Sequence, residues 1–479
     1  SALTFIHCAA FLMGSSRAKV HKSVAAYCCN AKLSFPHWQH FRIGGMVGKG
    51  FFSTNGILQG CPLSIVMLNL LMQVWASAVE GETGAKARCY ADDAQAACKE
   101  PATIHGILHT TSCFCDLTGM RMNIPKTHTW ARDGDLRNQL QNVHVHGVCL
   151  DCVLSDRFLG AQMAFTRQHT GNRDTSKRRK NAEAVLSRIG CVPLPLEARA
   201  HLVESMVNSK LLFDTSVAPT SKREMQRWRS QIITAIWGKG APSRCLELIF
   251  TLLCRGHATD PLQAAVYRII SAVKRLLSRH HDLIPQWRSL LDEIVPMISE
   301  MPGANVNCHG PAMRFIWAVR QLGWEITDPL TLRTHDGTDV PLLEIEEGLL
   351  QHLVRDDLRL SLWKEAAHRR PELQGIENGI DREATLSLVN SLRGADKRLL
   401  STVLMAGIDT RERKFRRRQA QHPGCLSCPG PNPPIENSKH IVVDCPSWQH
   451  VRRALPRYFD LQASPCLTER PLMRDIAQR

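Results

Sequence analysis

The spacing of apolar residues changes along the chain and predicts two kinds of secondary structure. Residues 1–165 combine short apolar runs with glycine turns, which is typical of an α+β fold. Within them, residues 63–79 are almost continuously apolar and predict a buried helix, and residues 103–117 predict a second helix that ends at Gly119. Residues 181–404 repeat apolar positions at helical spacing, so we expect them to be almost entirely helical.

Two stretches of the first part alternate as strands do. Residues 88–97 predict two short strands that meet at Ala91-Asp92-Asp93, and residues 143–159 alternate as a hairpin would. Together with the helices, these strands predict an α+β domain in which helices cover a small antiparallel sheet. A long helical region and a C-terminal segment rich in Cys and Pro follow it.

Charge and cysteine content indicate the class of partner and the compartment. The chain contains 60 Lys and Arg against 44 Asp and Glu, a net charge of +16, which favours a polyanionic partner such as nucleic acid. We find no apolar run long enough to span a bilayer and expect no membrane partner. The 18 cysteines are scattered in a long chain without a secretory signal, which indicates reduced thiols in an intracellular protein, both nuclear and cytoplasmic.

Four short motifs occur in a fixed order in the first part of the chain. They are Gly56-Ile57-Leu58-Gln59-Gly60-Cys61-Pro62-Leu63-Ser64, Cys89-Tyr90-Ala91-Asp92-Asp93, Thr118-Gly119-Met120-Arg121-Met122-Asn123-Ile124-Pro125-Lys126-Thr127 and Arg157-Phe158-Leu159-Gly160. Each is weak by itself, because adjacent acids in a turn are common and usually only solvated. Their joint order and spacing resemble the palm of reverse transcriptases, specifically of the non-LTR retrotransposon type.

This resemblance implies RNA-directed DNA synthesis, with an RNA template, a DNA primer and deoxynucleoside triphosphates as partners. Such nucleotidyl transfer uses two Mg²⁺ ions about 3.5–4 Å apart, and hard cations prefer carboxylate oxygens. By resemblance, Asp92 is the direct metal ligand and Asp93 is a neighbouring carboxylate, while Tyr90 lies beneath the primer end. Gln59 would contact the template strand, and Gly60 would allow close backbone approach to the templating base or the incoming nucleotide.

The two later motifs have an ordinary alternative reading beside the one that the resemblance implies. Lys126 matches a lysine that protonates the leaving pyrophosphate in these polymerases, but it is equally well explained as an exposed surface lysine. Phe158, Leu159 and Gly160 match the primer-grip hairpin, whose alternative is the end of an ordinary hairpin. Downstream, residues 186–237 resemble the helical thumb that clamps duplex through its backbone phosphates.

A separate cysteine and histidine pattern lies near the C-terminus. Cys425, Cys428, His440 and Cys445 have the spacing C-x₂-C-x₁₁-H-x₄-C, and three thiolates with one imidazole are suited to one structural Zn²⁺ ion. A similar finger closes many non-LTR retrotransposon proteins, usually with a shorter gap before the histidine. The six basic residues between Arg411 and Arg418 precede the finger and are candidates for phosphate contacts, although charge runs are often only solvated.

A second candidate metal set falls inside the predicted hairpin. His144, His146, Cys149 and Cys152 have a spacing compatible with zinc. However, alternate residues of a strand face opposite sides of a sheet, so we expect these four to serve packing instead.

One part of the polymerase pattern is missing. The family places its other metal-binding aspartate upstream of the Gln-Gly motif, whereas here no Asp or Glu precedes Glu80. We therefore expect the fingers and this aspartate to be absent and the fragment to be inactive. The rival hypothesis is a catalytically dead, retroelement-derived nucleic-acid-binding protein. A viral RNA-dependent RNA polymerase is a third reading, disfavoured because those enzymes usually carry Gly-Asp-Asp and lack the finger.

The expected organisation has five parts. A partial reverse transcriptase palm (1–168) precedes a helical thumb-like region (169–300), a helical connector (301–410), the basic run with the zinc finger (411–450) and a tail (451–479). The oligomeric state does not follow from the sequence. We also see no convincing set of four acids for an RNase H site near Thr334-His335-Asp336-Gly337.

Overall fold

The fold is taken from a computed structural model, which describes residues 4–8, 12–13, 38–40, 42–52, 62–166, 173–238, 244–299, 309–370, 373–428 and 430–450. The chain divides into two compact units. The first unit contains residues 1–156 and 164–171, and the second contains residues 157–163 and 172–479. Gln59 and Gly60 lie outside the described residues.

The first unit is built on a five-stranded sheet with the strand order β13-β10-β1-β8-β7. Neighbouring strands pair antiparallel except β10 and β13, which run parallel at one edge. The expected small antiparallel sheet therefore carries one parallel edge strand. The strands are β1 (Thr4–Cys8), β7 (Lys86–Tyr90), β8 (Asp93–Cys98), β10 (His128–Ala131) and β13 (Asp151–Cys152).

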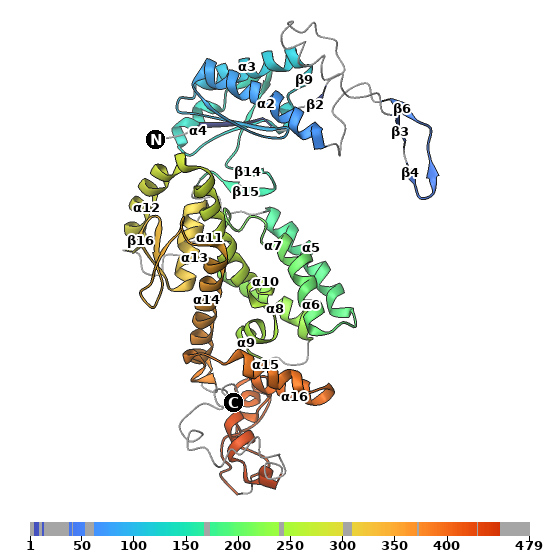
Figure 1. Ribbon diagram of the computed structural model, residues 1–479, viewed down its shortest axis with the longest axis vertical. Coiled ribbons are helices and arrows are strands. Elements are labelled where there is room, and N and C mark those ends of the chain that lie inside the picture. Colours follow the sequence, from blue (N-terminus) through green and yellow to red (C-terminus); the bar gives the residue numbers. More distant parts are fainter. Residues whose placement is uncertain are drawn as a thin grey trace. The chain divides into compact units, whose positions relative to one another are not determined.

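Two helices, α2 (Pro62–Thr83) and α3 (Thr103–Thr118), cover one face of this sheet (Figure 1). Their approach is possible because alternate residues of β8 are small and buried, as at Ala94 and Ala96. Trp75 of α2 donates a hydrogen bond from Nε1 to Thr111 Oγ1 of α3 at 3.1 Å inside the core. Helix α3 is followed by Gly119 with φ 71°, the left-handed end that a glycine permits. Both predicted helices are confirmed.

Helix α2 buries only part of its apolar surface. Met72, Trp75 and Val79 lie in the core, whereas Ile65 and Val74 on other sides of the helix are more than half exposed. Residues 64–83 are long and apolar enough to cross a membrane by length and composition. The sequence reading that no stretch meets this test was therefore too strict, because the few polar residues of α2 are uncharged over most of its length. The core helix of a soluble protein passes the same test.

The remaining strands of the first unit are short. The stretch at 143–159 was predicted to be one hairpin, but the structure divides it among several pairings. Strands β11 (His144–Val145) and β12 (Val148–Cys149) form a small hairpin, because His146 and Gly147 both adopt positive φ, as tight two-residue turns require. Strand β13 then joins the main sheet. The other elements are β2 (Leu12–Met13), β3 (Trp38–Gln39), β4 (Arg42–Ile43), β5 (Met46–Val47), β6 (Phe51–Phe52), β9 (Met120–Arg121), the 3₁₀ turn η2 (Ile124–Lys126) and α4 (Gly134–Leu140).

The second unit is mainly helical. One hydrophobic core extends through it from Ala182 to Ala406, with Trp228, Phe250 and Phe315 among its buried side chains. The helices are α5 (Arg173–Cys191), α6 (Leu196–Leu202), η3 (Val203–Asn208), α7 (Ser209–Leu211), α8 (Lys222–Trp237), α9 (Leu246–Leu248), η4 (Ile249–Leu253), α10 (Gly256–Thr259), α11 (Pro261–Arg279), η5 (His281–Leu283), α12 (Ile284–Ser299), α13 (Pro311–Leu322), α14 (Glu347–Arg369), η7 (Ile376–Asn378), α15 (Arg382–Ser391) and α16 (Gly394–Leu404).

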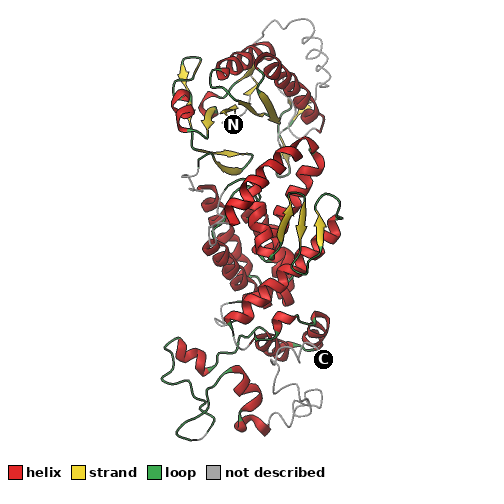
Figure 2. Ribbon diagram, turned by 90° about the vertical axis from the view of Figure 1, so that its left-hand side faces the viewer, coloured by secondary structure: helices red, strands yellow, loops and turns green. Residues whose placement is uncertain are grey.

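A three-stranded antiparallel sheet interrupts these helices, contrary to the expectation of an almost entirely helical region (Figure 2). It consists of β16 (Glu325–Asp328), β17 (Thr331–Arg333) and β18 (Asp339–Pro341). The turn between β17 and β18 is the Thr334-His335-Asp336-Gly337 segment, in which Gly337 has φ 88°. Thr334 and Asp336 are hydrogen-bonded to each other and to Thr338, so this motif builds a turn.

A buried ion-pair network lies in the core of the helical unit. Arg229 donates from Nε and Nη2 to the two carboxylate oxygens of Asp260, both at 3.0 Å. Glu247 accepts from Arg229 at 3.5 Å and from Arg369 at 2.7 Å. Asp260 also caps α11 by accepting from the Leu262 backbone N–H. The network therefore joins α8, α9, α11 and α14.

The C-terminal part of the second unit contains the basic helix and the cysteine cluster. Helix α17 (Arg411–Arg416) begins at Thr410, whose side chain accepts from the Arg413 N–H. The backbone N–H groups of Arg411 and Glu412 both donate to Glu436, one to its carboxylate and one to its carbonyl. Because Glu436 lies in the loop between Cys428 and His440, these bonds tie α17 to the loop that carries the cysteine cluster. The short turns η8 (His440–Asp444) and η9 (Pro446–Trp448) complete the described chain.

Candidate active site and metal centre

The two adjacent aspartates lie at the tight turn between β7 and β8. Tyr90 pairs with Asp93, so Ala91 and Asp92 alone form the turn. Ala91 has φ 52°, in the left-handed region where a non-glycine residue costs about 1–3 kcal/mol and where functional sites often store strain. Asp92 is exposed, Asp93 is partly exposed, and 65% of Tyr90 is accessible to solvent. The carboxylates are therefore accessible to a ligand at the edge of the sheet.

Strand β1 lies directly beside this turn. Its register with β8 pairs Cys8 with Ala94 and His7 with Gln95, so positions 7 and 93 lie on the same face of the sheet, two residues apart along β8. Strand β1 is therefore one of the two strands on which a second carboxylate could lie near Asp93. Residues 4–8 of β1 contain none, and position 7 is histidine.

Lys126 lies at the same edge of the sheet as the aspartates. Strand β1 runs antiparallel to both β8 and β10, so β8 and β10 begin at the same edge. Lys126 is exposed and lies two residues before the start of β10. With β1 between them, β8 and β10 are about 10 Å apart. The register thus brings Lys126 to the region of the acidic turn, while the two readings of its role stay open.

The acidic turn is not part of a metal-ligand cluster among the described residues. In the described parts of the chain, only one group of three or more Cys, His, Asp and Glu side chains has its ligand atoms close together, and it lies near the C-terminus. Asp92 and Asp93 belong to no such group.

The predicted primer-grip residues form a tight hairpin in the second unit. Strands β14 (Ser155–Phe158) and β15 (Ala161–Ala164) are joined by Leu159 with φ 47° and Gly160 with φ 83°. Positive φ at both turn positions matches the twist of paired strands, but leucine is an unusual residue at such a position. The hairpin therefore carries local strain at the site where the resemblance places a function.

Arg178 anchors this hairpin, a role that sequence reasoning missed. Its Nη2 donates to the Gly160 carbonyl at 2.6 Å, and its Nη1 pairs with Asp214 at 2.7 Å. The Phe213 ring lies below the guanidinium at 5.5 Å and so close to Gly160 that a Cβ there would meet Phe213 Cε1 at 2.9 Å. Arg178 belongs to the run Lys177-Arg178-Arg179-Lys180, yet its side chain is bonded within the second unit. A sequence shows the charge but not its partner.

The four predicted zinc ligands come together in one cluster. Cys428 Sγ lies 3.3 Å from His440 Nε2 and 3.6 Å from Cys445 Sγ, and the Cys425 and Cys445 sulfurs are 3.9 Å apart. Ligands at tetrahedral zinc distances of about 2.0–2.3 Å are separated by about 3.5–3.8 Å, so these spacings suit a four-coordinate ion. All four side chains are buried, and all four ligand atoms lie within 4.8 Å of one another. The cluster can hold a metal ion.

The surrounding loop holds these ligands in place. The Cys425 N–H donates to the Pro434 carbonyl at 2.9 Å, and the Cys445 N–H donates to the His440 carbonyl at 2.7 Å. Asn437 accepts from the His440 N–H at 2.8 Å through its side chain. Backbone bonds of this kind fix ligand positions before a metal binds.

The second His and Cys set forms no cluster. His144 pairs with Cys149 across the β11–β12 hairpin, and its Nδ1 lies 2.9 Å from the Asn142 carbonyl. Cys149 donates from its thiol to the Gln141 carbonyl at 3.1 Å. The interpretation that these residues serve local structure is thus consistent with their contacts.

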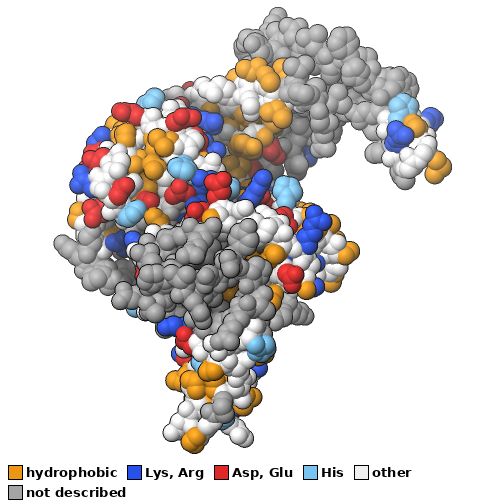
Figure 3. Space-filling model, turned by 60° about the horizontal axis from the view of Figure 1, so that its bottom comes forward, with side chains coloured by type: hydrophobic (Ala, Val, Ile, Leu, Met, Phe, Trp, Pro, Cys, Tyr) orange, Lys and Arg blue, Asp and Glu red, His pale blue; other side chains and the backbone are white. Residues whose placement is uncertain are grey.

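Charged surfaces are mixed on the face shown in Figure 3, where basic and acidic side chains are interspersed. The β4–β5 hairpin at the upper right carries basic side chains beside Met46 and Val47, which are 76% and 63% exposed. A net charge of +16 therefore does not imply one continuous basic face.

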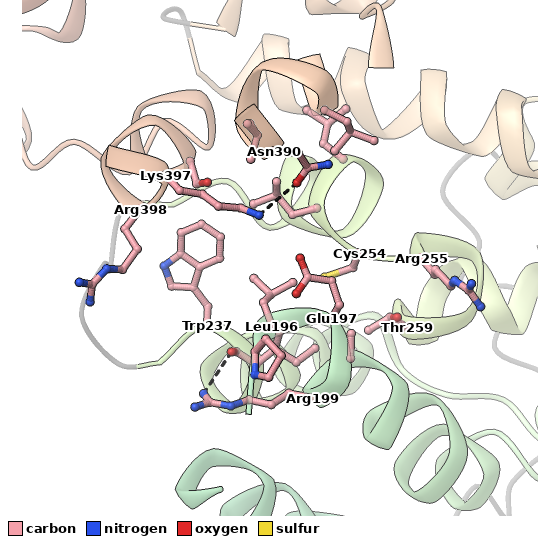
Figure 4. A pocket seen from close by; sticks show the side chains of 18 of the residues that line it. Leu196, Glu197, Arg199, Trp237, Cys254, Arg255, Thr259, Asn390, Lys397 and Arg398 are labelled. Carbon is pink, nitrogen blue, oxygen red and sulfur yellow. Dashed lines mark hydrogen bonds between the residues drawn. The ribbon is translucent and has the colours of Figure 1, made fainter. Parts of the chain in front are cut away.

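A cavity with a volume of about 1160 Å³ lies between α6, η4, α15 and α16 of the second unit (Figure 4). Trp237 and Lys397 line it, and Lys397 donates to Asn390 Oδ1 at 3.0 Å. Glu197 and Arg199 also line it, so its walls carry both signs of charge. Nothing in the sequence pattern predicted this cavity, because its walls come from distant segments.

Comparison with known proteins adds one family. Residues 19–162 match the family model described as reverse transcriptase (RNA-dependent DNA polymerase). The matched segment includes α2, α3, the acidic turn and Lys126. No curated protein matches the chain. Residues 19–162 are thus similar to reverse transcriptase domains, which in general act on a nucleic-acid template, a primer and nucleotides with the help of divalent metals.

Proposed function

We propose that residues 1–168 are the palm of a non-LTR retrotransposon reverse transcriptase, and that the 479-residue chain by itself binds primer–template without extending it. The observation that carries this proposal is the β7–β8 turn, which presents Asp92 and Asp93 beside a strand without a carboxylate. The order of the four motifs supports the non-LTR type. The family match to residues 19–162 supports the reaction class.

The physical reason for inactivity is the incomplete metal cage. Nucleotidyl transfer by two metal ions needs both ions held between the attacking and leaving oxygens. Histidine at position 7 has no carboxylate oxygen, the kind of ligand that hard Mg²⁺ prefers. Asp92 and Asp93 alone would bind an ion loosely, because neighbouring carboxylates in one turn converge from one side only.

The other parts of the chain supply binding in this proposal. Residues 169–300 act as a thumb, residues 301–410 as a connector, and the cysteine cluster near the C-terminus as a zinc finger with one structural Zn²⁺. With these partners, the protein would act in the nucleus and the cytoplasm. The supporting observations are the four-ligand geometry and the exposed basic residues of α17 and of the segment that follows it.

The test is primer extension in Mg²⁺ by the 479-residue chain, by a longer protein and by the Asp92→Asn variant of each. The 479-residue chain should bind an RNA template annealed to a DNA primer yet add no nucleotides. A longer protein that also contains an upstream aspartate motif should extend the primer, and Asp92→Asn should abolish that synthesis. Extension by the 479-residue chain that depends on Asp92 would contradict the proposal.

Position 7 allows a sharper version of this test. His7→Asp places a carboxylate on the strand beside Asp93, so it should restore detectable extension if β1 is the second metal-binding strand. His109→Asp adds the same charge at an exposed position of α3 and should restore nothing. If the upstream segment rescues synthesis but His7→Asp does not, the second carboxylate comes from elsewhere.

The alternative function is a nucleic-acid-binding protein that has lost polymerase chemistry altogether. The incomplete cage favours it as strongly as it favours an inactive fragment. The genomic sequence directly upstream of Ser1 separates the two. An in-frame aspartate motif there supports the enzyme, and an unrelated exon supports the binding protein.

A further inference from the structure

Four arginines line one small pocket in the second unit. Arg355 and Arg359 lie on consecutive turns of α14 and so on one face of it, Arg255 precedes α10, and Arg382 begins α15. The pocket has a volume of about 100 Å³. Among the described residues that line it, none is Asp or Glu. The others are Thr251, Cys254, Gly256, His257 and Gln263.

The acids near this pocket do not neutralise it. Asp356 is shared between Arg355 and Arg359, at 3.3 Å from each, and its own side chain is 36% exposed. Glu204 is the other acid that acts on the pocket, through its attraction to His257. One shared carboxylate and one outlying acid therefore face four guanidinium groups.

The protonation equilibria reflect this excess of positive charge. Burial and the neighbouring Arg382 lower the pKa of Arg359 to about 10. Burial and the charge of Arg355 likewise lower the pKa of both Arg382 and His257. The protonated form of each of these groups is thus less stable in the fold than in water. A bound anion would stabilise that protonated form.

The arginines are held in place by the surrounding structure. Arg382 donates from Nε to the Thr251 carbonyl at 3.1 Å, and Arg355 Nη2 lies 2.7 Å from His352 Nδ1. Arg359 lies beside the Trp363 ring at 5.9 Å. Gly256 is closely packed at the pocket wall, since a Cβ there would lie 2.6 Å from the Phe250 carbonyl and 2.8 Å from the Gln263 amide. Planar guanidinium groups fixed in this way match the oxygens of a phosphate.

We infer that this pocket binds a phosphate group, and that the group belongs to the backbone of a nucleic-acid strand. The volume suits a group of a few heavy atoms, since one water occupies about 30 Å³ in the liquid. The pocket shares Cys254, Arg255 and Arg382 with the larger cavity of Figure 4, which leaves space for the sugar and base of the same nucleotide. The assignment to a strand rests on the proposed function, whereas the assignment to a phosphate does not.

The phosphate itself is tested by thermal melting of the full chain. Inorganic phosphate should raise the melting temperature more than chloride at equal ionic strength. This increment should be lost in Arg359→Gln and in Arg255→Gln and kept in Lys364→Gln, which removes a charge from an exposed position of the same helix. Arg255 is exposed, so its variant should still fold if Arg359→Gln does not.

The strand is tested by anisotropy with a fluorescent single-stranded oligonucleotide. Arg255→Gln and Arg359→Gln should each weaken binding about tenfold, as loss of a charged hydrogen bond does, and Lys364→Gln should not. If the two arginine variants lose the stabilisation by phosphate but keep their affinity for the oligonucleotide, the strand assignment is wrong. The pocket would then be a site for free phosphate. Equal behaviour of all three variants in both measurements would overturn the pocket altogether. Failure of primer extension alone bears only on the proposed function.

Discussion

Left-handed backbone at single residues forms the two turns that carry the polymerase motifs. Ala91 in the acidic turn and Leu159 in the β14–β15 turn both have positive φ without being glycine. Each holds an unfavourable conformation that the flanking strand pairing must sustain. Gly160 is different, since its positive φ is ordinary for glycine and the nearby Phe213 ring leaves no space for a side chain.

Replacement of Gly160 by alanine tests this crowding. Gly160→Ala should lower the stability of the second unit by about 1–3 kcal/mol, because it combines positive φ with a contact to Phe213. Gly323→Ala is the matched control, with φ 72° and nothing near the added Cβ. Thermal melting should show the larger loss for Gly160→Ala, and Phe213→Ala should remove the difference. Equal losses with and without Phe213 would show that crowding is unimportant.

The buried carboxylate of Glu247 should make stability depend on pH. Burial raises the pKa of Glu247, but the guanidinium groups of Arg229 and Arg369 outweigh it and hold the pKa below its usual value. Its contribution is therefore complete above the unfolded pKa of about 4.3 and is lost as pH falls through the lower folded value. Melting curves between pH 3 and 7 should show a loss below about pH 4.

A pair of variants separates this effect from general acid unfolding. Glu247→Gln should destabilise the protein at neutral pH by about 3 kcal/mol and make the acid-induced loss smaller. Glu365→Gln removes a neighbouring acid that is 45% exposed and should leave both quantities nearly unchanged. A pH profile identical in the Glu247→Gln variant and the parent would rule out this carboxylate as the cause.

Residues that form a site together were predictable where they lie close to each other in the sequence. Asp92 with Asp93, and Cys425 with Cys428, are close in sequence and lie together in the structure for that reason. The partners of Arg178 and the four arginines of the phosphate pocket were not predictable. They come from segments far apart along the chain, and a single sequence carries no record of which charges meet.

At the scale of elements, periodicity predicted helices well and short strands poorly. Helices α2 and α3 have long apolar patterns, and Gly119 marks the end of α3. Strands β16 to β18 have only three or four residues each, too few for alternation to outweigh the helical pattern around them. The sheet position of β1 was also missed, because pairing of β1 with β8 and β10 joins residues that are distant in sequence.

The segment that carries the cysteine cluster should depend on a bound metal ion for its local structure. Purified protein should contain about one zinc ion per chain, and Cys428→Ser should release it, because three ligands bind zinc much less tightly than four. The loss should loosen residues 411–450 and leave the first unit folded. Elemental analysis gives the zinc content, and hydrogen exchange gives the local loosening.

Cys149→Ser is the matched control for the zinc measurement. The Cys149 thiol donates a hydrogen bond to the Gln141 carbonyl. Cys149 lies in a different part of the chain and in no cluster of ligand atoms among the described residues. The variant should keep the full zinc content. Freshly purified parent protein without zinc would disprove the metal assignment.

At the scale of the whole molecule, nucleic-acid affinity should follow salt more than sequence. The exposed Lys414 and Arg418 are candidates for phosphate contacts, whereas Arg413 donates to the Ala406 and Ile408 carbonyls at 2.6 and 2.7 Å. Changing Lys414 and Arg418 to glutamine should weaken binding and reduce the salt slope by about one unit each. Arg413→Gln should instead lower thermal stability. Asp92→Asn should change neither the nucleic-acid affinity nor its salt slope. Anisotropy titrations at several salt concentrations would expose salt-independent binding, which contradicts this view.

The division of the chain into two units has a consequence for recombination between related chains. The chain passes from the first unit to the second after residue 156, returns at residue 164 and enters the second unit again at residue 172. The β14–β15 turn therefore belongs to the same unit as Arg178, which bonds to it, although residues 164–171 of the first unit lie between them in the sequence. A recombination event between residues 164 and 172 would combine this turn with a foreign Arg178 region and break the anchor. An exchange before residue 156 would keep the two together. Functional chimaeras between relatives should therefore have their crossover points upstream of the turn, and shuffled libraries selected for folding should be depleted of junctions in the narrow interval behind it.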